Sequence, residues 1–148
     1  RMSPTSFTFL RGSAAIMAGD LAAGLSTDLR VELCGDAHLG NFRWYHAPTR
    51  ELVFDLNDFD ETLPGPFEWD VKRLAASFAI AARARDFSSK AERRAVLDVV
   101  RSYRTAMSEF AALPNLAVWY SRIDAQRVIE RPSSRPPGRC RRPSRSRR

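Results

Sequence analysis

The chain has 148 residues, enough for one domain with a hydrophobic core, and 44% of them are hydrophobic, as in ordinary globular proteins. Its net charge of +7 comes from 24 basic and 17 acidic residues, but eight of the arginines lie in residues 131–148, where there is no acid. Without that segment, 16 basic residues stand against 17 acidic ones, a net charge of −1. This excludes, as a first interpretation, the basic body expected of a nucleic-acid-binding domain.

Membrane and disulfide-rich classes are also disfavoured. No apolar run approaches the roughly 18 residues of a membrane helix, and residues 1–10 lack the apolar stretch of a secretion signal. We therefore expect a cytoplasmic protein with no membrane partner. The two cysteines, Cys34 and Cys140, are too few for a disulfide framework or a zinc site. Cys34 is interpreted as a small buried residue, because no base lies beside it in the sequence.

The first third of the chain predicts a helix followed by three strands. Residues 1–11 favour an extended segment, because Pro4 keeps the residue before it out of the helical conformation. Residues 12–24 are rich in alanine, with larger apolar residues near helical spacing, and Ser13 can cap the helix that they predict. Alternating patterns then predict three strands of one small antiparallel unit, at residues 29–34, 42–45 and 51–56.

The rest of the chain predicts helices. After a polar loop at residues 57–66, the spacing of apolar residues predicts three helices, at 67–85, 91–112 and 115–130. Ser88 supplies a capping signal for the second of these, and Pro114 ends it. The predicted fold class is therefore α+β, a small antiparallel sheet packed on a helical bundle.

The last segment, residues 131–148, has a different composition from the domain predicted at residues 1–130. It contains eight Arg and four Pro without apolar periodicity, so we predict a disordered tail. Nucleic acid would bind only through this tail. The favoured interpretation is that the tail is a frameshift artefact, because GC-rich DNA read in the wrong frame gives this composition.

Acidic and amide side chains gather in two loops, and each loop follows a predicted strand. The first loop reads CGDAHLGN at residues 34–41, and the second reads FDLNDFDE at residues 54–61. If the strands pair, both loops open on the same side of the sheet, and their carboxylates converge with an amide oxygen. Hard oxygen ligands suit Mg²⁺, which takes few protein ligands. A further carboxylate, held off the metal, can accept a proton from an attacking hydroxyl.

These motifs resemble known families. G-D-x-H-x-x-N, followed downstream by two apolar residues and Asp, resembles the active-site signature of the aminoglycoside phosphotransferase and choline kinase branch of the protein-kinase-like fold. WDVKRL at residues 69–74 is similar to the start of a helix in those enzymes. The longer stretches FLRGSAAIMAGDLA, CGDAHLGNF and FDLNDFDETLPGPFEWDVKRLAAS resemble the bacterial domain of unknown function 2252 family over about residues 2–125.

The resemblance implies the catalytic lobe of a protein-kinase-like fold and a role for each polar residue. Asp36 would be the catalytic base. Asn41 and Asp55 would bind Mg²⁺ or Mn²⁺, and Asp55 would bridge phosphate oxygens of ATP. Asp58 is the rival of Asp55 for that role.

Five further residues receive lesser roles from the same resemblance. Asp60 and Glu61 are third-rank candidates for the metal. His38 would brace the loop, and Asp70 would support it by accepting backbone N–H bonds. Arg11 would contact a phosphate of the cofactor, or it is a surface residue at a helix end.

The chain also lacks two nucleotide-binding motifs of the kinase-like enzymes that it resembles. It has no glycine-rich loop to cover phosphates and no strand lysine, because its only lysines, Lys72 and Lys90, lie in predicted helices. We therefore expect a truncated phosphotransferase, inactive alone, whose hydroxyl acceptor, a small molecule or a protein, is not identified. Two alternatives stay open. One is a metal-dependent phosphoester hydrolase, in which the same carboxylates activate water, and the other is a non-enzymatic binding module with a basic tail.

Overall fold

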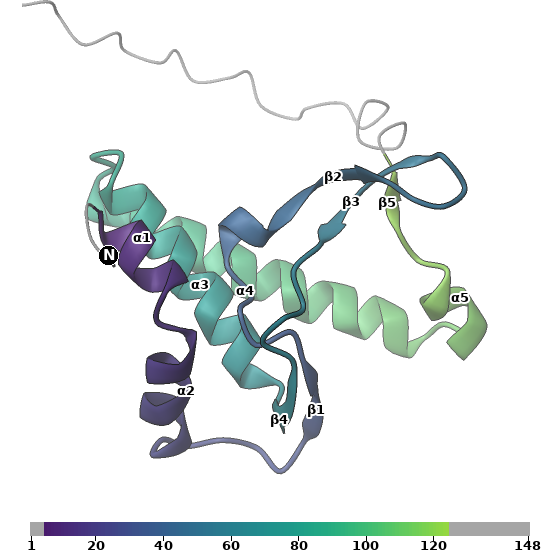
Figure 1. Cartoon of the computed structure of the whole chain (residues 1–148), viewed down its shortest axis with the longest axis horizontal. Helices are drawn as coiled ribbons and strands as arrows, with labels where there is room; N and C mark the ends of the chain where they lie inside the picture. Colours follow the sequence, from purple (N-terminus) through teal and green to yellow (C-terminus); the bar gives the residue numbers. More distant parts are fainter. Residues whose placement is uncertain (1–4, 125–148) are drawn as a thin grey trace, which may run out of the picture.

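Two long helices, α3 (Glu68–Arg83) and α4 (Ser89–Ala111), pack against each other and form the scaffold of the structure, a computed structural model that describes residues 5–124 (Figure 1). The Ser88 side chain caps α4 by accepting a hydrogen bond from the backbone N–H of Ala91. Half-buried residues of α4 recur at helical spacing, at Val96, Val99, Tyr103, Ala106 and Phe110. The helices predicted at 67–85 and 91–112 are confirmed within two residues at each end.

Two shorter helices, α1 (Ser6–Arg11) and α2 (Ala14–Ala22), precede the sheets and pack on α3. The helix predicted at residues 12–24 is confirmed as α2. The extended segment predicted at residues 1–11 is wrong over α1, because Thr5 caps that helix by accepting a hydrogen bond from the backbone N–H of Thr8. Ser13 takes the N-cap position of α2, but its Oγ donates to the Leu10 carbonyl instead of capping the helix.

The strands form two antiparallel sheets rather than one. In the first, β1 (Arg30–Leu33) pairs with β4 (Leu63–Pro66). In the second, β2 (Phe42–His46) pairs with β3 (Leu52–Leu56), and β3 pairs with β5 (Ile123–Asp124).

The predicted strands exist, but the expected pairing of the first with the others is wrong. Its partner, β4, lies in a segment predicted as loop, because the sequence Leu-Pro-Gly-Pro shows no alternation and no strand propensity. Gly65 suits this position because a Cβ there would lie 2.6 Å from Cδ1 of Leu33.

A short helix, α5 (Asn115–Trp119), and β5 occupy the segment predicted as one helix at 115–130. That prediction is wrong over residues 120–124, because Ile123 pairs with Phe54 of β3 and the chain leaves the helix to reach it. Residues 125–130 and the predicted disordered tail at 131–148 lie outside the described residues.

The buried interior is small and contains nearly as many polar as apolar residues. The buried apolar residues are Leu10, Leu33, Ala37, Val53, Leu56 and Ala82. The buried polar residues are Ser13, His38, Asn41, Arg73 and Ser77. The predicted α+β class with antiparallel sheets is confirmed. Across residues 5–124, no helix combines the length and the apolar character needed to cross a membrane.

Candidate functional site

One face of α3 holds the loop between β1 and β2. Asp70, Arg73 and Ser77 share this face because they are spaced by three and four residues. The Asp70 carboxylate accepts hydrogen bonds from the backbone N–H groups of Cys34, at 2.9 Å, and Gly35, at 3.1 Å. The Ser77 Oγ, fully buried, accepts one from the backbone N–H of Leu39 at 3.0 Å. The helix therefore fixes both ends of the loop.

Asp36 lies at the centre of this loop and is surrounded by donors. Arg73 donates through Nε to Oδ1 of Asp36 at 2.5 Å. Oδ2 of Asp36 lies 3.3 Å from Nε2 of His38 and 3.5 Å from Nδ2 of Asn41. The side chain is 14% exposed, so part of it remains accessible to an acceptor group.

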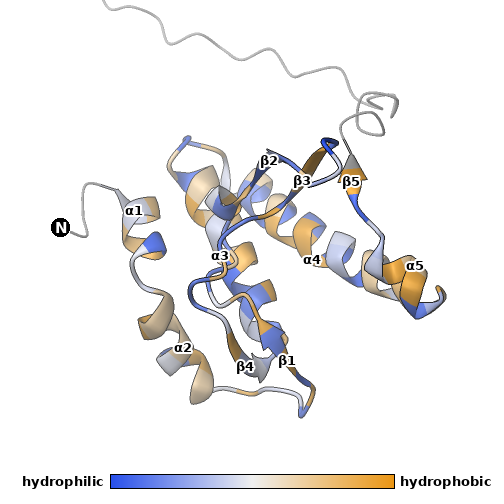
Figure 2. Cartoon of the chain, turned by 45° about the vertical axis from the view of Figure 1, so that its right-hand side comes forward, coloured by the Kyte–Doolittle hydropathy of each residue, from blue (hydrophilic) through white to orange (hydrophobic). Residues whose placement is uncertain are grey.

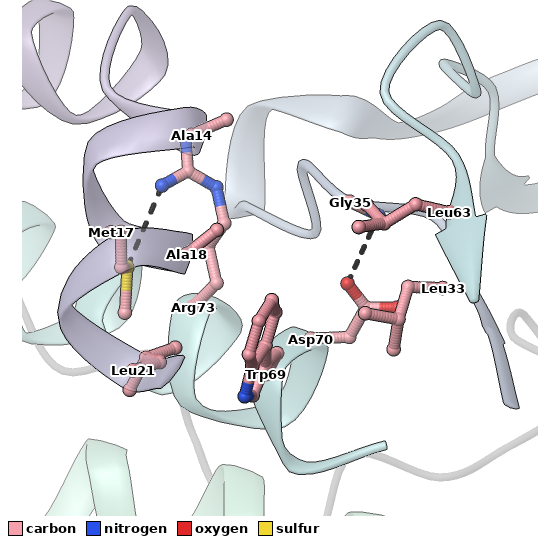
Figure 3. A pocket seen from close by; sticks show the side chains of 10 residues that line it. All are labelled: Ala14, Met17, Ala18, Leu21, Leu33, Gly35, Leu63, Trp69, Asp70 and Arg73. Atoms are coloured by element: carbon pink, nitrogen blue, oxygen red, sulfur yellow. Dashed lines mark hydrogen bonds between the residues drawn. The ribbon is translucent and has the colours of Figure 1, made fainter. Parts of the chain in front are cut away.

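Arg73 is buried, with 2% of its surface exposed. It contacts α1, α2 and the loop after β1, and Figure 3 shows its guanidinium beside Met17 of α2. Besides Asp36, its Nη2 donates to the carbonyl of Leu10 at 2.7 Å, and its Nη1 lies 3.6 Å from Sδ of Met17. Arg73 and Ser77 were not among the predicted site residues. Their spacing after Asp70 was the available signal, because it places them on the same helix face.

His38 braces the loop from inside. Its Nδ1 accepts a hydrogen bond from the backbone N–H of Gly40 at 3.0 Å, which leaves the ring proton on Nε2, facing Asp36. Burial lowers the pKa of His38 below its ordinary value of 6.5, and the positive charges of Arg73 and Arg11 lower it further, although Asp36 opposes them. His38 is therefore a neutral donor to Asp36 at neutral pH.

Arg11 lies at the C-terminal end of α1 and is exposed. Its charge acts on His38, so it lies near the loop. A phosphate contact for Arg11 stays a prediction.

Asn41 is almost completely buried and touches Asp36. Its Nδ2 donates to the backbone carbonyl of Asp36 at 2.9 Å and lies 3.5 Å from the carboxylate. Because the nitrogen of the carboxamide is used in this way, its oxygen is the atom available to a cation.

The second predicted loop lies beside the first and contacts it at both ends. At one end, the backbone N–H of Asn57 donates to the carbonyl of Asn41 at 3.1 Å. At the other end, Gly35 approaches Glu61 so closely that a Cβ on Gly35 would lie 1.9 Å from the Glu61 carbonyl oxygen. The two loops therefore converge as predicted, but the pairings β1–β4 and β2–β3 bring them together instead of a single sheet.

Asp55 lies on β3 and is exposed. It stands opposite Arg43 in the register, two residue pairs before the contact between Asn41 and Asn57. Residues two apart on a strand share a face, so this register places Asp55 and Asn57 on one face. The Asn57 carboxamide bridges the two strands when its nitrogen donates to the Asn41 carbonyl and its oxygen accepts from Nε of Arg43.

Asp58 lies in the second loop and is half-buried. Its Oδ1 accepts a hydrogen bond from the backbone N–H of Asp60 at 3.5 Å, a turn contact. The structure therefore places Asp55 two residue pairs from the contact between Asn41 and Asn57, and Asp58 directly after Asn57 in the second loop. Which of the two binds a cation stays open.

The donor set suits a magnesium ion with few protein ligands. Over the described residues, no group of three or more His, Cys, Asp or Glu side chains is close enough to hold a metal. What the loops offer is the amide oxygen of Asn41 with the carboxylate of Asp55 or Asp58. Mg²⁺ commonly binds through one or two carboxylates and completes its shell with water and phosphate oxygens.

Cys34 contributes no nucleophile. Burial, together with the negative charge of Asp70, raises the pKa of its thiol to about 12. The thiol is therefore protonated at neutral pH. Cys34 was interpreted as a small buried residue, but in the structure it is only half-buried.

Comparison with known proteins identifies the family. A family model described as "Uncharacterized protein conserved in bacteria (DUF2252)" matches residues 1–146. The chain belongs to the DUF2252 family. Neither the curated proteins nor the solved structures include a match to it. In this DUF2252 chain, the stretch CGDAHLGNF supplies Asp36, His38 and Asn41, and WDVKRL supplies Asp70 and Arg73.

Proposed function

We propose that this chain carries the metal- and acceptor-binding part of a phosphotransferase that uses ATP and Mg²⁺, with a lobe of the protein-kinase-like type. The observation that supports it best is the contact between Asp36 and Asn41 in a loop that α3 holds from one end to the other. Phosphoryl transfer requires mainly the positioning of groups and the neutralisation of charge, and a fixed carboxylate beside a fixed amide meets the first requirement.

Each residue has one task in this proposal. Asp36 orients the acceptor hydroxyl and receives its proton. Asn41 and Asp55 hold Mg²⁺, which when bound neutralises charge on the phosphate oxygens. His38 donates to Asp36 and keeps it in place, and Arg11 contacts a phosphate of ATP.

The acceptor in this proposal is a compound with a hydroxyl group, either a small molecule or a protein. A hydrolase that uses the same residues would differ in one respect, since water would take the place of the acceptor and ATP would not be needed. Dependence on ATP therefore distinguishes the two activities.

A thermal melt of the full chain tests the proposal. It is recorded without ligand, with Mg²⁺, with ATP, and with both. A ligand that binds only the folded state stabilises it, by about 2.7 kcal/mol at a concentration of 100 times its Kd. We expect a clear increase in the melting temperature only with Mg²⁺ and ATP together. An increase with Mg²⁺ that ATP does not enlarge favours the hydrolase, and a cooperative melt indifferent to all ligands contradicts both.

A further inference from the structure

Arg73 connects the proposed catalytic carboxylate to the N-terminal helices. Its guanidinium donates to Asp36 on one side and to the carbonyl of Leu10, in the last turn of α1, on the other. The Leu10 carbonyl is itself fixed, because it also accepts hydrogen bonds from the backbone N–H and the Oγ of Ser13, at 3.1 and 2.9 Å. The guanidinium is therefore held in place independently of Asp36.

The contact between Asp36 and Asn41 creates a difficulty for the proposed reaction. A cation on the Asn41 amide oxygen would have the carboxylate of Asp36 as its neighbour, and Mg²⁺ prefers carboxylate ligands. If Asp36 turned to the metal, the charge of the metal would make its carboxylate a weaker base toward the acceptor hydroxyl. Something must keep the carboxylate and the metal apart.

We propose that Arg73 is a positioning residue that keeps Asp36 out of the coordination shell of the metal. This inference rests on the proposed function. Two donors of the guanidinium, Nε and Nη2, lie against Oδ1 of Asp36. Turning the carboxylate toward a metal would leave the buried positive charge of Arg73 without its partner, which is costly in a site where Arg73 is almost fully enclosed.

The same arrangement explains why an arginine stands at this position. Its planar fork places one donor on the carbonyl of Leu10 and others on Asp36 at the same time. A lysine supplies a single ammonium group and would hold the two partners less rigidly. The N-terminal helices thus support Asp36 although they contribute no residue that touches the proposed metal.

Manganese binding to the full chain tests this inference without any measurement of activity. Mn²⁺ is titrated, with detection by electron paramagnetic resonance, into the wild type, Arg73→Gln, Asp36→Asn and the double variant. We expect Arg73→Gln to bind Mn²⁺ roughly tenfold more tightly, because the freed carboxylate becomes a ligand and a nearby positive charge is lost. The double variant should lose this gain, and Asp36→Asn alone should stay near the wild type.

Arg83→Gln is the matched control. Arg83 lies on the same helix and also pairs with a carboxylate, that of Glu92, but its side chain is exposed. This variant removes the same charge and should leave Mn²⁺ affinity unchanged. If it raises the affinity as much as Arg73→Gln does, the gain comes from general electrostatics and the inference is wrong.

Arg73→Lys covers the case in which Arg73→Gln does not fold, as judged by circular dichroism. It keeps the buried charge, and we expect a smaller gain in Mn²⁺ affinity, roughly twofold or more, because the ammonium holds Asp36 less firmly. In that case an affinity equal to that of the wild type overturns the inference.

The outcomes separate this inference from the proposed function. If the wild type binds Mn²⁺ and the Arg73 variants bind it no more tightly, the role of Arg73 is wrong. The proposed metal site is still supported in that case. Binding only after Arg73 is replaced, and only with Asp36 present, supports the role of Arg73 while contradicting a working metal site in this chain. Absence of Mn²⁺ binding in every folded variant overturns both.

Discussion

At the scale of single residues, Gly35 shows how a backbone requirement joins the two loops. Its φ of 80° lies in the left-handed region, and its α-carbon faces the backbone of Glu61. A side chain there is disfavoured twice, by the backbone conformation and by the clash with Glu61. Glycine is therefore needed at the point where the first loop begins.

We predict that Gly35→Ala destabilises the chain by about 2–4 kcal/mol, because an alanine would have to displace the backbone of Glu61. Urea unfolding followed by circular dichroism measures the change. Gly19→Ala is the control, since Gly19 lies in α2 and a Cβ there meets no atom within 4 Å. That variant should stabilise the chain by about 0.5–1 kcal/mol. Equal effects of the two substitutions would contradict this account of Gly35.

His38 should make stability depend on pH. Folding lowers the pKa of His38, so the unfolded chain binds the proton more readily than the folded chain does. The free energy of unfolding should therefore fall as the pH decreases from 6.5 toward the lowered pKa. Urea unfolding at several pH values measures the slope. His38→Gln should remove this slope below pH 6.5, whereas His46→Gln should retain it.

The two candidate carboxylates for the metal can be separated by substitution. We predict that Asp55→Asn removes most of the Mg²⁺-dependent increase in melting temperature, because Asp55 lies near the end of β3, two residue pairs from the contact between Asn41 and Asn57. Asp58→Asn should keep that increase, and so should Asp36→Asn, since Asp36 is held by Arg73. Each variant is compared with its own melt without ligand. The reverse result for Asp55 and Asp58 would move the metal assignment to Asp58.

At the scale of elements, α3 supports the candidate site through side chains on one face. We predict that Ser77→Ala costs about 0.5–1.5 kcal/mol, because it removes the part-buried hydrogen bond between the Ser77 Oγ and the backbone N–H of Leu39. Ser102→Ala on the exposed surface of α4 is the matched control and should change stability by less than about 0.5 kcal/mol. Denaturant unfolding of both variants gives the comparison, and a neutral Ser77→Ala would show that Leu39 finds another acceptor.

The elements themselves differ in how well their sequences predict them. α4 has long apolar periodicity and a serine cap, which are local signals, and its bounds were predicted within two residues. The sequence of β4, Leu-Pro-Gly-Pro, carries no such signal. It becomes a strand because Leu63 and Gly65 pair with β1 and pack on Leu33. Its structure depends on its partner.

At the scale of the whole molecule, apolar surface is exposed along α4 and α5 (Figure 2). A groove of about 580 Å³ lies between β1, α3 and α4, with Val31, Val71, Val100 and Met107 among its walls. Trp119 at the end of α5 is 82% exposed. The stability of the fold therefore comes from few residues, those buried beneath the sheets and around the loop.

This distribution predicts unequal effects of two apolar substitutions. Leu33→Ala should cost about 2–5 kcal/mol, because Leu33 is 1% exposed and its removal leaves a cavity under Gly65. Trp119→Ser should change the free energy of unfolding by less than about 0.5 kcal/mol. Equilibrium unfolding in urea measures both. A large loss of stability in Trp119→Ser would show that the exposed face is covered in solution.

The sequence by itself determined the long helices, three of the strands and some of the polar residues near the site, Asp36, His38, Asn41 and Asp70 but not Arg73 and Ser77. These depend on signals within a few residues of each other, such as apolar spacing, caps and the composition of a loop. It also indicated that the loop bearing Asp36 and the loop bearing Asp58 belong together. The sequence did not show which strand pairings bring the two loops together.

The tertiary structure alone decided the partners. Arg73 reaches Asp36 across 37 residues of sequence, and β1 pairs with β4 instead of with its neighbours in the chain. Such contacts depend on which surfaces can be buried together and on which buried polar groups then find donors or acceptors. No local sequence pattern shows which of these contacts forms. The contact between Arg73 and Asp36 is therefore known only from the folded structure.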